Sequence, residues 1–185
     1  WTQADVKAYL DVAYSDFYTR SLGLIVQMAY EWCQRLGDMR VIKWDNLDLL
    51  EQKMHIQQSK RRAEVFLPIS DGLNKMLTQQ KEDFGFQEYV APRPRPRRGL
   101  YVPYTITKLP VEGRKIMDSA GLSKELRLSD LRRTGTTEMV DAGVSMGNIM
   151  SVTGHTNPQS VKPYMKNTFA SANLALSTRK NLTHC

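Results

Sequence analysis

The sequence predicts a mainly α-helical fold with one small antiparallel β-sheet, which belongs to the α+β class. Three observations support this prediction: several stretches repeat apolar residues at helical spacing, only two short runs are typical of strands, and a polar segment joins those runs as a hairpin would. The chain has 185 residues, so we expect residues 1–185 to form a single domain. Its 41% hydrophobic and 24% charged residues exclude a disordered or fibrous chain. Its apolar runs are far shorter than the roughly 20 residues that a bilayer span requires.

The first two helices follow from an amino-terminal cap and from apolar periodicity. Thr2 with Asp5 three residues later forms a capping-box pattern, which begins a helix over about 3–19. Residues 21–34 place apolar side chains on one face, which predicts a second helix. Gly37 then interrupts the helical pattern.

A hairpin and a third helix come next. Two β-like runs at 53–57 and 63–67 are separated by the polar residues 58–62, which we expect to form the hairpin tip. Asp71 then caps a helix that runs to about residue 80.

Residues 83–104 form a basic segment that is incompatible with a helix, because prolines alternate with arginines along it. The arginines of this alternation are Arg93, Arg95, Arg97 and Arg98. Two interpretations stay open for it. It is a solvated loop, or it is an extended strand that contacts phosphates.

Helical patterns return in the second half of the chain. The periodicity predicts helices at 105–119, 129–142, 145–152, 158–164 and 170–179. A glycine follows each of the first three, and a proline begins the fourth, as expected at helix ends and starts.

The charge balance points to an acidic partner. Lys and Arg total 26 against 19 for Asp and Glu, which gives a net charge of +7. Such a basic chain favours a polyanion, most often a nucleic acid and sometimes a membrane surface. Cys33 and Cys185 are too few for a disulfide framework or a zinc site, which favours a reducing intracellular setting. The chain begins at Trp1 rather than Met, so we expect it to be a fragment of a longer protein.

Side chains from several segments suit one phosphodiester reaction. The segments are 34–38, 58–60, 129–134, 153–156 and Tyr164. Two arginines can hold the non-bridging oxygens of one phosphate, because guanidinium groups stay charged and bind phosphate bidentately. A tyrosine can attack as a nucleophile, a lysine at a hairpin tip can protonate a leaving oxygen, and a histidine can hydrogen-bond the phosphate. No metal or cofactor is required. Each residue alone also fits an ordinary surface or core role, so the hypothesis depends on their joint order.

These segments resemble the catalytic domain of the tyrosine recombinases, the phage integrase family, over roughly residues 1–178. The run Gln34-Arg35-Leu36-Gly37-Asp38 and the hairpin residues Gln58-Ser59-Lys60 are especially similar to lambda-type integrases, and the pair Trp44-Asp45 follows the pattern of the whole family. The rest of the pattern is Leu131-Arg132-Arg133-Thr134, Gly154-His155-Thr156 and Tyr164, nine positions after the histidine.

The resemblance implies a set of site residues. The implied catalytic residues are Arg35, Lys60, Arg132, His155 and Tyr164. The expected DNA-binding residues are Arg61, Arg93, Arg95, Arg97, Arg98 and Arg133. Two positions depart from the family: Cys33 replaces a glycine, and Ser129 replaces a histidine that is thought to assist proton transfer. Serine is a poor base, so two outcomes stay open: the reaction is slower, or Asp130 or water substitutes in proton transfer.

The function that the resemblance implies is site-specific DNA recombination. The tyrosine attacks a phosphodiester and forms a 3′-phosphotyrosyl link, without metal or ATP. The implied partners are double-stranded DNA and, on DNA, three further copies of the chain in a synapse; without DNA the chain can be a monomer. An upstream DNA-binding domain, no membrane association and a place on DNA in the bacterial cytoplasm are also implied. The segment 170–175 would dock on a neighbouring protomer or pack on its own domain.

Three other functions stay open. The chain could be a DNA-binding relative whose Ser129 marks a loss of activity. It could resemble type IB topoisomerases or telomere resolvases, which use the same chemistry without strand exchange. It could also be an unrelated basic helical protein.

Overall fold

The computed structural model describes residues 1–60, 62–165, 172, 173, 175–177 and 179. The α-helices are α1 (Gln3–Tyr14), α2 (Phe17–Glu31), α3 (Leu36–Met39), α4 (Asp71–Phe84), α5 (Lys108–Ser119), α6 (Leu131–Asp141) and α7 (Met146–Thr153). The 3₁₀ turns are η1 (Trp44–Asn46), η2 (Leu128–Asp130), η3 (Pro158–Ser160) and η4 (Lys162–Tyr164). The strands are β1 (Leu47–Asp48), β2 (Lys53–Gln57) and β3 (Glu64–Pro68). This arrangement confirms the predicted α+β class.

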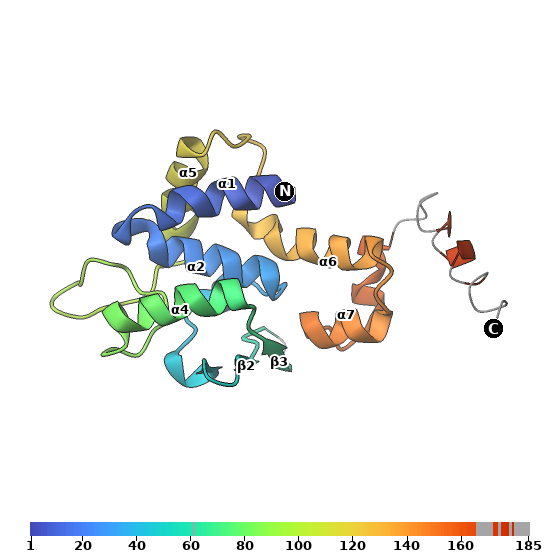
Figure 1. Cartoon of the computed structure of the whole chain (residues 1–185), viewed down its shortest axis with the longest axis horizontal. Coiled ribbons are helices and arrows are strands. Elements are labelled where there is room, and N and C mark those ends of the chain that lie inside the picture. The colour runs from blue at the N-terminus through green and yellow to red at the C-terminus, as the bar shows by residue number, and fades with distance from the viewer. Residues whose placement is uncertain (61, 166–171, 174, 178, 180–185) are drawn as a thin grey trace.

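Helix α2 is the centre of the core. It lies between α1 and α4 in Figure 1, and it also contacts α5 and α6. Several apolar side chains of α2 have no exposed surface, namely Leu24, Ile25, Val26, Met28 and Ala29. Burying each of the larger ones favours folding by about 1.5–3 kcal/mol, so α2 holds the surrounding helices in place.

The boundary between the first two helices differs from the prediction. The capping box forms as expected, since Thr2 accepts from the Asp5 amide at 3.1 Å and the Asp5 carboxylate accepts from the Thr2 amide at 2.7 Å. However, α1 ends at Tyr14 rather than near residue 19. The carboxylate of Asp16 accepts from the amide of Tyr18 at 2.7 Å and so begins α2 there.

The sheet has the antiparallel order β1-β2-β3. Met54 pairs with Leu67 and Ile56 with Val65, and all four side chains are buried on the face toward the core. The hairpin of β2 and β3 was predicted to within a residue. The third strand, β1, was not, because two residues carry no alternation that sequence reasoning can detect.

Proline and glycine positions account for the remaining differences. Helix α4 continues to Phe84, and beyond it the basic segment folds back on itself through bridges such as Pro92–Pro103. The expected helix at 158–164 consists of two 3₁₀ turns, because Pro163 has no amide hydrogen to donate to the preceding turn. Pro110 is tolerated because it lies in the first turn of α5.

The last expected helix lies only partly within the described residues. At 172, 173, 175–177 and 179 the backbone is helical, and Leu174 lies outside the described part. None of the helices in the described part of the chain is both long and apolar enough to cross a bilayer.

Candidate active site

Arg35 is held at the carboxyl end of α2. The chain turns there through Cys33 at φ +50°, and Arg35 then begins α3. Its Nη1 donates to Gln58 Oε1 at 3.3 Å and lies 3.8 Å from the carboxylate of Asp38. The guanidinium is therefore positioned from two sides while its side chain stays 27% exposed, so it remains accessible from solvent.

Two buried glutamines, Gln34 and Gln58, join three segments that are distant in the sequence and lie next to Arg35. The amide nitrogen of Gln58 donates to Gln34 Oε1 at 2.6 Å and to the carbonyl of Thr153 at 2.8 Å. The amide nitrogen of Gln34 donates to the carbonyl of Val152 at 2.7 Å. Both glutamines have no exposed surface, so losing a partner would leave a buried polar group unsatisfied at about 1–3 kcal/mol. These bonds fix the ends of α2, β2 and α7 against one another.

Gly154 is required by this junction. It has φ +68°, and a Cβ at this position would lie only 2.6 Å from the amide nitrogen of Gln58. Any side chain here would push the amide away from Gln34 and Thr153. Steric exclusion by the Gln58 amide therefore explains why the residue before His155 is a glycine.

Arg132, on α6, lies beside the same junction. Its Nη2 donates to the carbonyl of Thr153 at 2.7 Å and contacts His155 Nε2 at 3.2 Å. Its Nη1 is buried and has no hydrogen-bond partner among the residues that the structure describes. Burial, followed by the neighbouring charge of Arg35, lowers the pKa of Arg132 to about 10. It stays protonated near neutral pH, so a half-buried cation has one buried N–H group that is available to an acceptor.

His155 and Tyr164 complete this side of the site. His155 is 9% exposed, and its Nδ1 lies 2.7 Å from the hydroxyl oxygen of Thr153. Its ring centroid is 6.4 Å from that of Tyr164, with the planes at 39°. Tyr164 belongs to η4, which packs against α6, the helix that carries Arg132. Four predicted residues from four segments are therefore neighbours.

One cavity of about 510 Å³ opens onto both arginines. Besides apolar side chains, it is lined by Arg35, Arg40, Arg114, Arg127, Ser129 and Arg132. No carboxylate belongs to this lining among the described residues, so the cavity favours an anion. Sequence reasoning missed three of these arginines, Arg40, Arg114 and Arg127, because no spacing in the chain relates them. Ser129 is exposed in η2 at the wall of the cavity.

The amino terminus lies beside this cavity as well. The indole Nε1 of Trp1 donates to the carbonyl of Arg127 at 2.8 Å, and the ring packs edge-on against Tyr9. Trp1 thus holds the segment that leads into Ser129.

Lys60 is not joined to the other four residues by any contact within the described part of the chain. It is exposed at the hairpin tip, where the Ser59 amide donates to the Asp38 carboxylate at 3.2 Å. Arg61 lies outside the described residues. Arg133 is exposed on α6, on a different side of the helix from Arg132.

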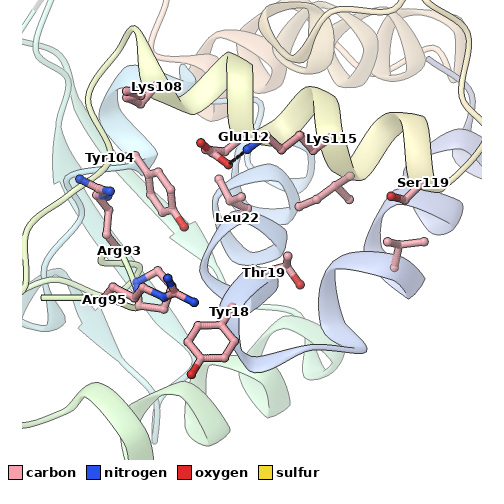
Figure 2. A pocket seen from close by; sticks show the side chains of 13 residues that line it. Tyr18, Thr19, Leu22, Arg93, Arg95, Tyr104, Lys108, Glu112, Lys115 and Ser119 are labelled. Carbon is pink, nitrogen blue, oxygen red and sulfur yellow. Dashed lines mark hydrogen bonds and ion pairs between the residues drawn. The ribbon is translucent and has the colours of Figure 1, made fainter.

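The arginines of the basic segment lie elsewhere. Figure 2 shows Arg93 and Arg95 at a separate cavity of about 400 Å³, which α5 and the junction of α1 with α2 also line. The guanidinium carbon of Arg95 is 5.2 Å from the ring centroid of Tyr18. Arg97 and Arg98 are exposed at the end of the loop. Among the described residues the two cavities share no lining residue, so Arg93 and Arg95 line a different cavity from Arg132.

Solved structures share this fold. The XerA recombinase matches with a TM-score of 0.76 and 17% identity, covering 97% of this chain and 62% of that chain. A lambda integrase dimer bound to a COC′ core site matches at 0.69 and 20% identity, covering 90% of this chain and 47% of that chain. The Tn1549 transposon integrase in complex with a circular intermediate DNA matches at 0.75 and 12% identity, covering 96% and 65%. The chain therefore spans less than two thirds of each of these structures.

Sequence comparison agrees with the fold. No curated protein matches the chain. The profile of the phage integrase family, however, matches residues 2–171, which is nearly its whole length. The chain belongs to the phage integrase family.

Proposed function

We propose that this chain is the catalytic domain of a site-specific DNA recombinase, which cuts and rejoins DNA through a 3′-phosphotyrosyl link without metal or ATP. The observation that supports this most strongly is that Arg35 and Arg132 line one cavity, whose described lining residues include no carboxylate, with His155 and Tyr164 close to Arg132. Family membership supports the same class of reaction.

The two arginines bind the scissile phosphate. As the phosphorus becomes pentacoordinate, negative charge grows on its non-bridging oxygens. Arg35 and the unpaired Nη1 of Arg132 are fixed cations that donate to these oxygens. Because their attraction increases as the charge grows, they favour the transition state over the bound substrate.

Tyr164 is the nucleophile. Its phenol oxygen forms a bond to phosphorus while the bond from phosphorus to the 5′ oxygen breaks, and Lys60 protonates that leaving oxygen. A 5′ hydroxyl from a partner duplex then attacks the phosphotyrosine and reverses the sequence. One ester replaces another at each step, so no external energy source is needed.

The proposed setting follows the solved relatives. Those relatives include a lambda integrase tetramer bound to a Holliday junction, besides the DNA complexes named above. We propose double-stranded DNA as the substrate, a tetramer of this chain on DNA, an upstream DNA-binding domain, and a place on DNA in a bacterial cell. The proposed role of residues 170–175 in a neighbouring protomer stays a prediction, because part of that segment lies outside the described residues.

A nicked DNA site that traps the covalent complex tests the proposal. Wild-type protein should give a protein–DNA band that survives denaturation. Tyr164→Phe should abolish this band while DNA binding stays near the wild-type level, because only the nucleophilic oxygen is lost. Equal bands from both proteins would refute Tyr164 as the nucleophile.

The same assay separates a second candidate, a DNA-binding relative without activity. The exposed Ser129, in place of an imidazole, favours that candidate. It predicts binding of the nicked site with no covalent band from the wild type. Relaxation of supercoiled plasmid without strand exchange would instead indicate topoisomerase-like activity.

A further inference from the structure

The hydroxyl of Thr153 determines which nitrogen of His155 carries the proton. This hydroxyl lies 2.7 Å from the carbonyl oxygen of Ile149 and 2.7 Å from His155 Nδ1. A carbonyl oxygen can only accept, so the single hydroxyl hydrogen goes to Ile149. The contact with the imidazole is then possible only if Nδ1 carries a hydrogen and donates it to the hydroxyl oxygen.

The other ring nitrogen leads to the same assignment independently. Nε2 lies 3.2 Å from Nη2 of Arg132, and a guanidinium nitrogen can only donate. Nε2 must therefore offer its electron pair. The neutral tautomer with hydrogen on Nδ1 satisfies both contacts, whereas the tautomer with hydrogen on Nε2 would break both.

We propose that Thr153 is a positioning residue, which holds His155 in the Nδ1–H tautomer and leaves the basic Nε2 facing Arg132. This position matters because Ser129 removes the imidazole that the family has elsewhere in the site. His155 is the only imidazole among the proposed catalytic residues, and Thr153 makes its inward nitrogen a proton acceptor rather than a donor.

The catalytic consequence rests on the proposed function. When the phenol oxygen of Tyr164 bonds to phosphorus, its hydrogen passes to Nε2, and the Nδ1–H bond to Thr153 stays in place. The imidazolium then has a hydrogen on Nε2, which it donates to a phosphate oxygen as negative charge develops there. It returns that hydrogen to the phenol oxygen when the strand is rejoined. His155 thus changes from acceptor to donor in step with the chemistry.

Nitrogen-15 spectra of the histidine rings test the tautomer. The whole chain, without DNA and at a mildly alkaline pH where imidazoles are neutral, is compared with its variants, and a His155→Gln sample identifies the His155 signals. Wild type and Thr153→Ser should both show hydrogen on Nδ1 and none on Nε2. Thr153→Val should lose this pattern, because Nδ1–H has no acceptor. An Nε2–H signal in the wild type, or a wild-type pattern in Thr153→Val, would overturn the proposal.

Thr136→Val is the matched control. Thr136 is equally buried and makes the equivalent bond, donating to the carbonyl of Arg132 at 2.7 Å, but it lies on α6, whereas Thr153 ends α7 two residues before the imidazole. Its loss should leave the His155 pattern unchanged. If Thr153→Val does not fold, the wild-type and Thr153→Ser spectra still decide the assignment.

Single-turnover cleavage of the nicked site tests the consequence. Thr153→Val should cleave at least about tenfold more slowly than wild type at saturating DNA, while Thr153→Ser should stay within about threefold. An unchanged rate in Thr153→Val would overturn the role in proton transfer. A wild type that never cleaves would refute the proposed function, whereas the ring spectra would still decide the tautomer.

Discussion

Arg132 combines three features that are seldom found together at one side chain. It is a half-buried cation, it lies beside a second cation, and its buried Nη1 is unpaired within the described part of the chain. Burial and like charge both disfavour a guanidinium, and they lower its pKa to about 10. A bound phosphate would offset both the burial of the guanidinium and its repulsion by Arg35. Relief of these two unfavourable effects would therefore strengthen phosphate binding.

Substitution of this arginine tests that account. Arg132→Ala and Arg35→Ala should each lower the single-turnover cleavage rate by two to three orders of magnitude, because a contact to the developing oxyanion contributes about 3–4 kcal/mol. Arg133→Ala, which removes the exposed neighbour on α6, should change that rate by no more than a few-fold at saturating DNA. A few-fold loss in Arg132→Ala would mean that its guanidinium does not contact the reacting phosphate.

At the scale of elements, the packing of α2 against α6 depends on the close contact between Cys33 and Gly135. Cys33 occupies a left-handed conformation at φ +50°, which explains why a glycine suits this position in the family. Its sulfur lies over Gly135 of α6, where an added Cβ would be 2.6 Å from the sulfur and 2.9 Å from the carbonyl oxygen of Tyr30. Burial also raises the pKa of the Cys33 thiol to about 11, so this thiol acts as a packing group.

Urea unfolding of variants measures how much the contact between Cys33 and Gly135 contributes to stability. Gly135→Ala should lower the free energy of unfolding by about 1–3 kcal/mol, because the methyl group overpacks the interface. Adding Cys33→Gly should restore part of the loss, since it removes the sulfur but leaves the Tyr30 carbonyl. Strictly additive effects of the two substitutions would contradict direct contact between the positions.

Some of the helices and strands could be predicted from the sequence, and others could not. The hairpin follows from alternation, and Gly154 is correctly predicted to end a helix. The break between α1 and α2 at Asp16 was missed because the apolar periodicity continues on both sides of it. The only signal for the break is one capping carboxylate. The motifs identified four of the side chains that meet at the site. Arg40, Arg114 and Arg127 were missed as parts of it, because only the folded chain brings them together.

For the whole molecule, the basic side chains behind the net charge of +7 include two groups of arginines. One lines the cavity around Arg132, and the other lies on the basic loop from Arg93 to Arg98. The two cavities have no lining residue in common among the residues that the structure describes. Under the proposed function, the loop is therefore suited to contacting duplex away from the reacting phosphate rather than to chemistry.

The salt dependence of DNA binding tests this division. If Arg97 and Arg98 each neutralise a phosphate, their joint replacement by Ala should make the slope of log K against log salt shallower by about 1.8. Replacing the exposed Lys7 and Lys75, which belong to neither region, should leave the slope unchanged. An unaltered slope in the arginine variant would favour the interpretation of a solvated loop.

The indole of Trp1 bonded to the Arg127 carbonyl has a practical consequence. Residues that precede Trp1 in a longer protein would therefore reach this domain close to the segment that leads into Ser129. A small fluorophore attached there through a spacer would report the arrival of a nucleic acid by a change in its emission.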